Sequence, residues 1–303
     1  MPANFPEVWI ARLIEKLREA DEATFLDGIP ELIGDVSVIN GGAMNEQNQV
    51  HVAATDFDID ILINNNTYPI PLQAYNDETI TIMLDKYQSK VVALTDDQTI
   101  GASYDKIDAV QRNYKVRQVE EKYQKAIHSI APLANTTATP VIEATGGPDA
   151  IEIDGRLIFT YEDLVEANRK TKGFKKKRLV LCEDHWNDLL LDRKRFGDQL
   201  VNYKTGMPMP NIAGFEITHY LGEMPIFDSS LDKKAYGAAF DGVAGDKRAS
   251  VIFNPNRVAK KTGITKQYFK PSSLDPENQT NKLSYRHYFI ATPFQARYIA
   301  AIV

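Results

Sequence analysis

The longest regular pattern of apolar and polar positions lies in residues 102–131. These thirty residues contain no Gly or Pro, Pro132 follows them, and Ser103 can cap a first turn. Their apolar positions form two sets: Tyr104, Ile107, Val110 and Tyr114 in the first half, and Val116, Val119, Tyr123, Ile127 and Ile130 in the second. At 100° per residue, the two stripes lie about 160° apart. The pattern predicts one helix of roughly 40 Å that is covered on opposite sides along its two halves. A two-helix hairpin broken near Lys115 is the alternative.

A second helical pattern lies in residues 6–20. Its apolar stripe consists of Trp9, Leu13, Ile14, Leu17 and Ala20, and Pro6 suits a first-turn position. Residues 22–42 follow with Gly, Pro and isolated apolar residues in no firm period. Two interpretations of the helix stay open, because it either folds back on its own domain or docks as an arm on a neighbouring subunit.

Between residues 50 and 87 the apolar period changes to two, which is typical of strands. Phe57, Ile59, Ile61 and Ile63 alternate with Asp56, Asp58 and Asp60, and Ile80, Ile82 and Leu84 alternate with Thr79, Thr81 and Asp85. Residues 64–78, between these arms, contain Pro69 and Pro71. The pattern predicts a long ribbon with an irregular tip, which needs cover because an isolated ribbon is only marginally stable. A solvated face is favoured over a calcium loop for the three Asp residues, since the sixth and twelfth loop positions hold Ile61 and Thr67.

The second half of the chain alternates helices and strands. Residues 133–150 form a linker of small residues around Gly146-Gly147-Pro148, where we place a domain boundary. Helices are predicted after Thr160, with Asp163 completing a capping box, and after Asp184. Strands are predicted at 179–182, 224–227, 249–253, 283–291 and 295–303, and residues 197–222 read as loop. The basic run 169–178 indicates a solvated turn rather than a polyanion contact. The alternation of helices and strands predicts that this half of the chain has an α+β or α/β fold.

The composition narrows the class of protein. The chain has 303 residues, 43% hydrophobic and 25% charged, which suits about two soluble domains. Its net charge of −6 argues against a dedicated nucleic-acid binder. Charged residues interrupt the N-terminal apolar residues, so we expect no signal peptide, and no run is apolar enough to span a membrane. We therefore expect an aqueous, reducing compartment.

The sequence offers little catalytic chemistry. Cys182 is the single cysteine, and the five histidines show no metal-ligand spacing. Cys182 and His185 make a weak zinc pair, and Cys182 closes an apolar strand, where a structural thiol is typical. The chain lacks the phosphate-loop, dinucleotide-binding, serine-elbow and metalloprotease motifs. We predict no catalytic, cofactor-binding or metal-binding residue.

The order of segments resembles the major capsid protein of tailed bacteriophages, in the Hong Kong 97 phage-type fold shared with encapsulins. The resemblance covers nearly the whole chain. The stretches that carry it are 9–13 in the arm, 80–87 on the ribbon's return, 177–181 followed by 186–190, and 221–227. Each stretch alone is a weak signature, and their order and spacing make the resemblance.

The resemblance implies an α+β fold with an N-terminal arm at 1–45 and an extended loop, the ribbon, at 46–98. It implies a spine-helix peripheral domain at 99–133 and 256–303 and a mixed α/β axial domain at 134–255. The implied function is a structural subunit, without enzyme activity, that assembles as hexamers and pentamers into an icosahedral virion shell around double-stranded DNA. The expected subunit contacts are Trp9, Leu13, Leu17, Tyr68, Ile70 and Leu72. Assembly is expected in the host cytoplasm, with a portal and with non-specific contacts to the packaged DNA.

Two departures from the family pattern add expectations. Residues 64–78 contain no Lys, so we expect a shell without covalent crosslinks. No long segment precedes Trp9, so we expect a separate scaffolding protein and no large maturation cleavage. An encapsulin compartment that loads an enzyme is an alternative in the same fold. A soluble two-domain enzyme with a site assembled from distant residues is another.

Overall fold

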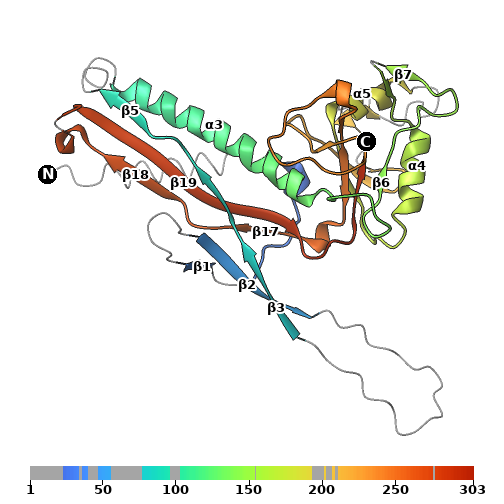
Figure 1. Ribbon diagram of the computed structural model, residues 1–303, viewed down its shortest axis with the longest axis horizontal. Coiled ribbons are helices and arrows are strands. Elements are labelled where there is room, and N and C mark those ends of the chain that lie inside the picture. Colours follow the sequence, from blue (N-terminus) through green and yellow to red (C-terminus); the bar gives the residue numbers. More distant parts are fainter. Residues whose placement is uncertain are drawn as a thin grey trace, which may run out of the picture.

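The computed structural model describes residues 23–33, 36–39, 47–55, 77–95, 103–153, 155–192, 201–202, 207–208, 211–275 and 277–303. Figure 1 shows a long helix lying along an elongated sheet, a more compact mixed body at one end, and a ribbon that projects away from both. The chain is thus a mixed α/β protein, as expected. Within the described residues, no helix is both long and apolar enough to cross a membrane.

The long helix α3 is a single element, Ser103–Ile130, which confirms one rod over a hairpin. Tyr123, Ile127 and Ile130 of the second stripe are buried in the largest core cluster. On the opposite side, Tyr114 packs edge-on against Tyr285, with ring centroids 5.2 Å apart. Val116 departs from the prediction, because it is 51% exposed. The side chains of Tyr104, Ile107 and Val110 lie outside the described set.

A six-stranded sheet forms the centre of the compact body. Its order is β12 (Asn211–Ile212), β13 (Phe215–His219), β9 (Arg178–Leu181), β16 (Ser250–Phe253), β20 (Ile299–Ile302) and β6 (Val141–Ile142). Strand β9 pairs parallel with β13 and antiparallel with β16. Because side chains alternate between faces, Val180 and Cys182 join the cluster beneath α3, whereas Leu179 and Leu181 join a second cluster on the other face.

Two helices cover that second face. Helix α4 (Tyr161–Lys170) begins after Thr160 with the predicted capping box, in which Thr160 and Asp163 bond each other's backbone. Helix α5 (Glu183–Leu191) begins two residues earlier than predicted, so the assignment of Asp184 as its cap is wrong. Its N-cap is Cys182, whose sulfur accepts a hydrogen bond from the His185 amide at 3.4 Å. Cys182 is the single residue between β9 and α5, so it occupies the N-cap position.

A second, five-stranded sheet lies against α3. Its central strand is β19 (Thr280–Pro293), with β17 (Val258–Thr262) and β18 (Lys266–Lys270) on one edge and β4 (Asp85–Gln88) and β5 (Val92–Thr95) on the other. Leu283, Tyr285 and Phe289 are buried on the side of β19 that the helix covers. The predicted strand 283–291 is therefore confirmed and extended.

The ribbon consists of β1 (Val36–Ile39), β2 (Gln47–Thr55) and β3 (Asp77–Met83). Strand β2 pairs antiparallel with both neighbours, and its pairing with β3 runs from Gln49↔Met83 to Thr55↔Asp77. This confirms the predicted return arm that contains Ile80 and Ile82. The outer arm at 56–63, with its three Asp residues, lies outside the described residues, as does nearly all of the tip.

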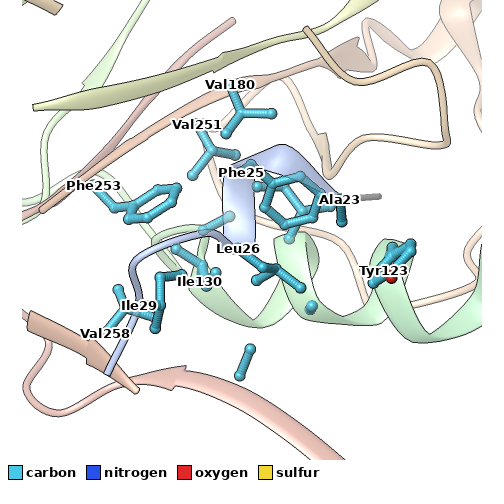
Figure 2. Close-up of a cluster of buried hydrophobic side chains, with 14 of the residues drawn as sticks. Ala23, Phe25, Leu26, Ile29, Tyr123, Ile130, Val180, Val251, Phe253 and Val258 are labelled. Carbon is cyan, nitrogen blue, oxygen red and sulfur yellow. The ribbon is translucent and has the colours of Figure 1, made fainter. Parts of the chain in front are cut away.

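Residues 23–33, which the sequence left without a period, are inserted into the main core. The short 3-10 helix η1 (Thr24–Leu26) places Phe25 and Leu26 between α3 and strands β9 and β16, and Ile29 follows them (Figure 2). Arg178 fixes the segment, because its guanidinium donates to the carbonyls of Phe25 (3.0 Å) and Asp27. It also forms a bidentate pair with Glu216, at 3.2 and 2.9 Å. This part of the predicted arm therefore belongs to the body.

Three other expectations for the second half need correction. Residues 197–222 are not all loop, because β12 and β13 extend the six-stranded sheet there. Arg178 does not lie on the solvated basic turn, since it is only 7% exposed. The last strand, β20, pairs with β16 and β6, so it does not join the five-stranded sheet with the rest of residues 256–303. Parallel pairing of β13 with β9 depends on partners distant in sequence, and a local pattern does not reveal it.

The remaining elements are short. They are β7 (Glu152–Ile153), β8 (Arg156–Leu157), β10 (Val201–Asn202), β11 (Met207–Pro208), β14 (Ile226–Phe227), β15 (Lys247–Arg248), η3 (Gly242–Ala244), η4 (Pro255–Arg257) and η5 (Ser272–Leu274). Strand β14 confirms the end of the predicted strand 224–227, and β16 confirms most of 249–253.

Candidate subunit interface

The base of the ribbon is packed tightly on the five-stranded sheet. Val50 and Leu84 are buried against Tyr288 and Ile290 of β19, and the Leu84 amide donates to the Asn48 carbonyl at 2.9 Å. Gly263 closes this joint, and its amide donates to the Tyr288 carbonyl at 2.8 Å. A Cβ at Gly263 would lie 2.8 Å from Tyr288 Cβ and 2.9 Å from Leu84 Cδ2. The base of the ribbon therefore lies in a close-packed seat on the sheet, and this seat leaves no room for a side chain at position 263.

Beyond this seat, the ribbon extends away from the rest of the chain (Figure 1). Its strands are held by their own ladder and by a polar pair on one face, where His51 Nδ1 lies 3.1 Å from Thr81 Oγ1. A ribbon of two or three strands needs packing on an apolar face for independent stability. The ribbon is thus anchored at its base and projects from the body at its other end.

A groove of about 900 Å³ lies on the other side of the five-stranded sheet, between α3 and the edge strands β4 and β5. Four tyrosines line it: Tyr87, Tyr114, Tyr236 and Tyr285. The Tyr114 hydroxyl donates to the Lys90 carbonyl at 2.9 Å, and the Tyr236 hydroxyl donates to Glu121 Oε2 at 2.7 Å. The Lys125 ammonium lies 5.0 Å from the centre of the Tyr236 ring.

Three tyrosines of the groove, Tyr87, Tyr114 and Tyr236, have a raised pKa and stay neutral at physiological pH. Burial and the nearby Asp85 carboxylate raise the pKa of Tyr87. Burial raises the pKa of Tyr236, and its hydrogen bond to Glu121 raises it further. The walls therefore present aromatic rings and neutral hydroxyls, which suit an occupant with an apolar face.

The single cysteine and its neighbours are sealed in the core and have a structural role. Cys182 is 1% exposed, and burial raises the pKa of its thiol to about 11, so it is not a thiolate at neutral pH. His185 Nδ1 lies 2.8 Å from Ser250 Oγ, and burial lowers the pKa of this histidine to about 3. The burial of Cys182 agrees with the expectation of a structural thiol. Among the described residues, no three His, Cys, Asp or Glu side chains gather as a metal site.

The predicted contact residues lie outside the described part of the chain. These are Trp9, Leu13 and Leu17 of the arm and Tyr68, Ile70 and Leu72 of the ribbon tip. Their role stays a prediction. Sequence reasoning missed the groove, because its tyrosines come from segments near 87, 114, 236 and 285 that only the tertiary fold brings together. Among these four tyrosines, only Tyr114 was predicted from the sequence to be covered, because it belongs to the first apolar stripe of the helix.

The fold combines a long helix on a five-stranded sheet, a mixed body and a projecting ribbon. This combination defines the class of Hong Kong 97-type capsid folds, and the comparison with solved structures confirms it. The chain aligns with the mature capsid of bacteriophage PhiM1 at a TM-score of 0.53 and 13% identity, over 84% of this chain and 81% of that one. It aligns with a virus-like particle from Pyrococcus furiosus at 0.56 and 10% identity, over 99% and 100%. The capsid of an empty GTA particle gives 0.55 and 10%, over 91% and 88%. No family model and no curated protein matches the sequence. The chain thus has the fold of capsid shell proteins.

Proposed function

We propose that this protein is the major capsid protein of a tailed bacteriophage, assembling as hexamers and pentamers into an icosahedral shell around double-stranded DNA. The observation that carries the proposal is the ribbon, because its base is packed tightly on the body while strands β2 and β3 project away from it. The fold shared with capsid proteins supports the same reading. The site of assembly is the host cytoplasm, and the mature location is the virion.

The proposed contacts between subunits are many and individually modest. Trp9, Leu13 and Leu17 of the arm and Tyr68, Ile70 and Leu72 of the tip lie on neighbouring copies in this proposal. A heterologous contact that is repeated from copy to copy closes a ring of subunits. Because each contact is of modest strength, wrongly placed subunits can dissociate and assembly errors can be corrected. The net charge of −6 suits a wall that contacts packaged DNA without sequence specificity and without clamping it.

A separate scaffolding protein and a portal complete the proposal, and the shell is held without covalent crosslinks. Negative-stain microscopy of the full chain, expressed with and without a candidate scaffold, tests assembly. Uniform closed shells are expected with the scaffold, and small particles at every concentration would count against the function. A denaturing gel of mature particles should show single chains, and protein present only as multimers too large to enter would refute the absence of crosslinks.

An encapsulin-type compartment is the second candidate, and the end-to-end alignment with the virus-like particle favours it. The two functions differ in content, because a virion encloses DNA and a compartment encloses a cargo protein. Nuclease treatment of purified shells followed by extraction distinguishes them. Protected double-stranded DNA supports the virion, and a stoichiometric second protein without DNA supports the compartment.

A further inference from the structure

Three long stretches of the chain contain no acidic residue. They are residues 167–182, 247–274 and 278–303, and together they contain 17 of the 35 Lys and Arg residues. By contrast, residues 19–85 contain thirteen acidic residues and not one Lys or Arg. The net charge of −6 is therefore an average over regions of opposite charge, and the fold decides which cationic segments meet.

The first of these stretches forms a hydrogen-bonded turn between α4 and β9. Thr171 ends α4, and its amide and its hydroxyl both donate to the Ala167 carbonyl, at 3.0 and 2.7 Å. The Phe174 amide donates to the Thr171 carbonyl at 3.3 Å, and Gly173 has a φ of +93°, which a residue without a side chain adopts readily. Four exposed lysines of this turn form no ion pair within the described residues: Lys170, Lys172, Lys175 and Lys176.

Aromatic rings join this turn to two arginines from the other acid-free stretches. Phe174 packs edge-on against Tyr298, with ring centroids 5.6 Å apart. The Arg257 guanidinium lies 5.1 Å from the centre of the same Tyr298 ring, and Arg297 directly precedes Tyr298 in the chain. Both arginines are exposed. The fold thus gathers six exposed cations on one surface, which we call the basic junction patch: Lys170, Lys172, Lys175, Lys176, Arg257 and Arg297.

The charge of this patch is not neutralised by the carboxylates beside it. Glu166 accepts a hydrogen bond from Arg169 at 2.7 Å, and Glu216 accepts one from Arg178 at 2.9 Å. These carboxylates are thus engaged by arginines that lie outside the patch. The sequence alone indicates a solvated turn for residues 169–178. The structure adds two arginines and two aromatic rings that no local pattern reveals, and it leaves the six cations available to an external anion.

We propose that the basic junction patch binds the phosphate backbone of double-stranded DNA. The proposal rests on the proposed function, since the virion supplies the DNA, and it names the surface of the wall that the DNA contacts. Lys and Arg neutralise phosphates and release counterions whatever the base sequence, so the contact is non-specific. The rings of Phe174 and Tyr298 pack on each other, so the patch presents charge rather than an apolar pocket. This favours a polyphosphate over a peptide segment as the occupant.

Fluorescence anisotropy with labelled double-stranded DNA of random sequence tests the contact, using the full chain below its assembly concentration over a series of salt concentrations. The patch variant is Lys172→Glu with Lys175→Glu. The matched control, Lys86→Glu with Lys266→Glu, reverses two exposed cations of the five-stranded sheet and changes the net charge equally. The patch variant should raise the Kd for DNA by about tenfold or more. It should also reduce the slope of log K against log salt by about two, because each lost phosphate contact removes about one. The control should bind DNA like the wild type, and circular dichroism and thermal melting check that each variant is folded.

Lysine acetylation of whole particles tests the same contact in the shell. Lys172 and Lys175 should react less in DNA-filled particles than in emptied ones, whereas Lys266 should react equally in both. A wild-type chain that does not bind DNA, or equal DNA binding by the patch and control variants, overturns the inference while shell formation still supports the proposed function. A patch variant that binds DNA normally but fails to assemble shows that the patch contacts a neighbouring copy, and the inference is then wrong. A wild-type chain that forms no shells overturns the proposed function, and the anisotropy assay still decides whether the patch binds DNA.

Discussion

Replacing Phe25 by Ala tests whether residues 23–33 are an integral part of the folded body. Phe25 is 1% exposed and packs edge-on against Tyr220 and Tyr123, with ring centroids 5.1 and 6.3 Å apart. It occupies the space between α3 and the six-stranded sheet (Figure 2). The substitution leaves a cavity in the largest core cluster.

The expected loss follows from the buried area. A buried Phe removes roughly 150 Å² from water, which at about 25 cal/mol per Å² amounts to about 4 kcal/mol. This agrees with the range of about 3–5 kcal/mol observed when a core Phe is truncated to Ala. A typical domain has only about 5–15 kcal/mol of stability, so the variant should be close to its folding limit.

The assay is urea unfolding of the full chain at a concentration below assembly, followed by tryptophan fluorescence and circular dichroism. The midpoint should fall at an unchanged slope. Ile33→Ala is the matched control, because Ile33 belongs to the same segment and is 93% exposed; its free energy of unfolding should change by less than about 0.5 kcal/mol. A loss below about 1 kcal/mol for Phe25→Ala would refute the placement of this segment in the core.

Three further predictions concern other parts of the fold. Arg178→Met leaves the carbonyls of Phe25 and Asp27 without their donor and should cost about 3 kcal/mol in urea unfolding. Arg169→Met breaks an exposed pair with Glu166, which solvent screens, so it should leave the urea midpoint nearly unchanged. Equal losses for the two variants would contradict the role of Arg178. Gly263→Ala should lower thermal stability and loosen the ribbon base, seen as faster amide exchange in β2 and β3, and unchanged exchange would contradict the close contact. Acid should destabilise the protein, because burial lowers the pKa of His185 to about 3 and of His287 to about 4. Between pH 6.5 and 4 the unfolded chain binds more protons than the folded one, so the free energy of unfolding should fall by up to about 1.4 kcal/mol per pH unit for each histidine. A pH-independent urea midpoint would contradict this.

Local patterns predicted the elements that depend on local physics. Helix α3 follows from thirty residues without a breaker, and α4 follows from the capping box of Thr160 and Asp163. Strand β19 follows from its apolar run. Each of these signals lies within a few turns of the residues it describes, so tertiary packing does not alter it.

Three of the misses have a common physical cause, since each depends on partners distant in sequence. Phe25 and Leu26 are held by α3 and by Arg178, which lies 153 positions from Phe25. Strand β13 is short, and its position in the six-stranded sheet depends on parallel pairing with β9. The tyrosine groove joins four separate segments. Cys182 caps α5 because the strand and helix follow without a loop, which overrides the usual preference for Asp.

Sedimentation velocity of the full-length chain over a wide range of concentration tests the central claim most directly, namely that this chain completes its structure only among copies of itself. The account predicts that the 34.1 kDa chain gives way, as concentration rises, to rings and then to much larger closed particles. A single species of monomer mass at every concentration, with the ribbon protected from proteolysis, would contradict it.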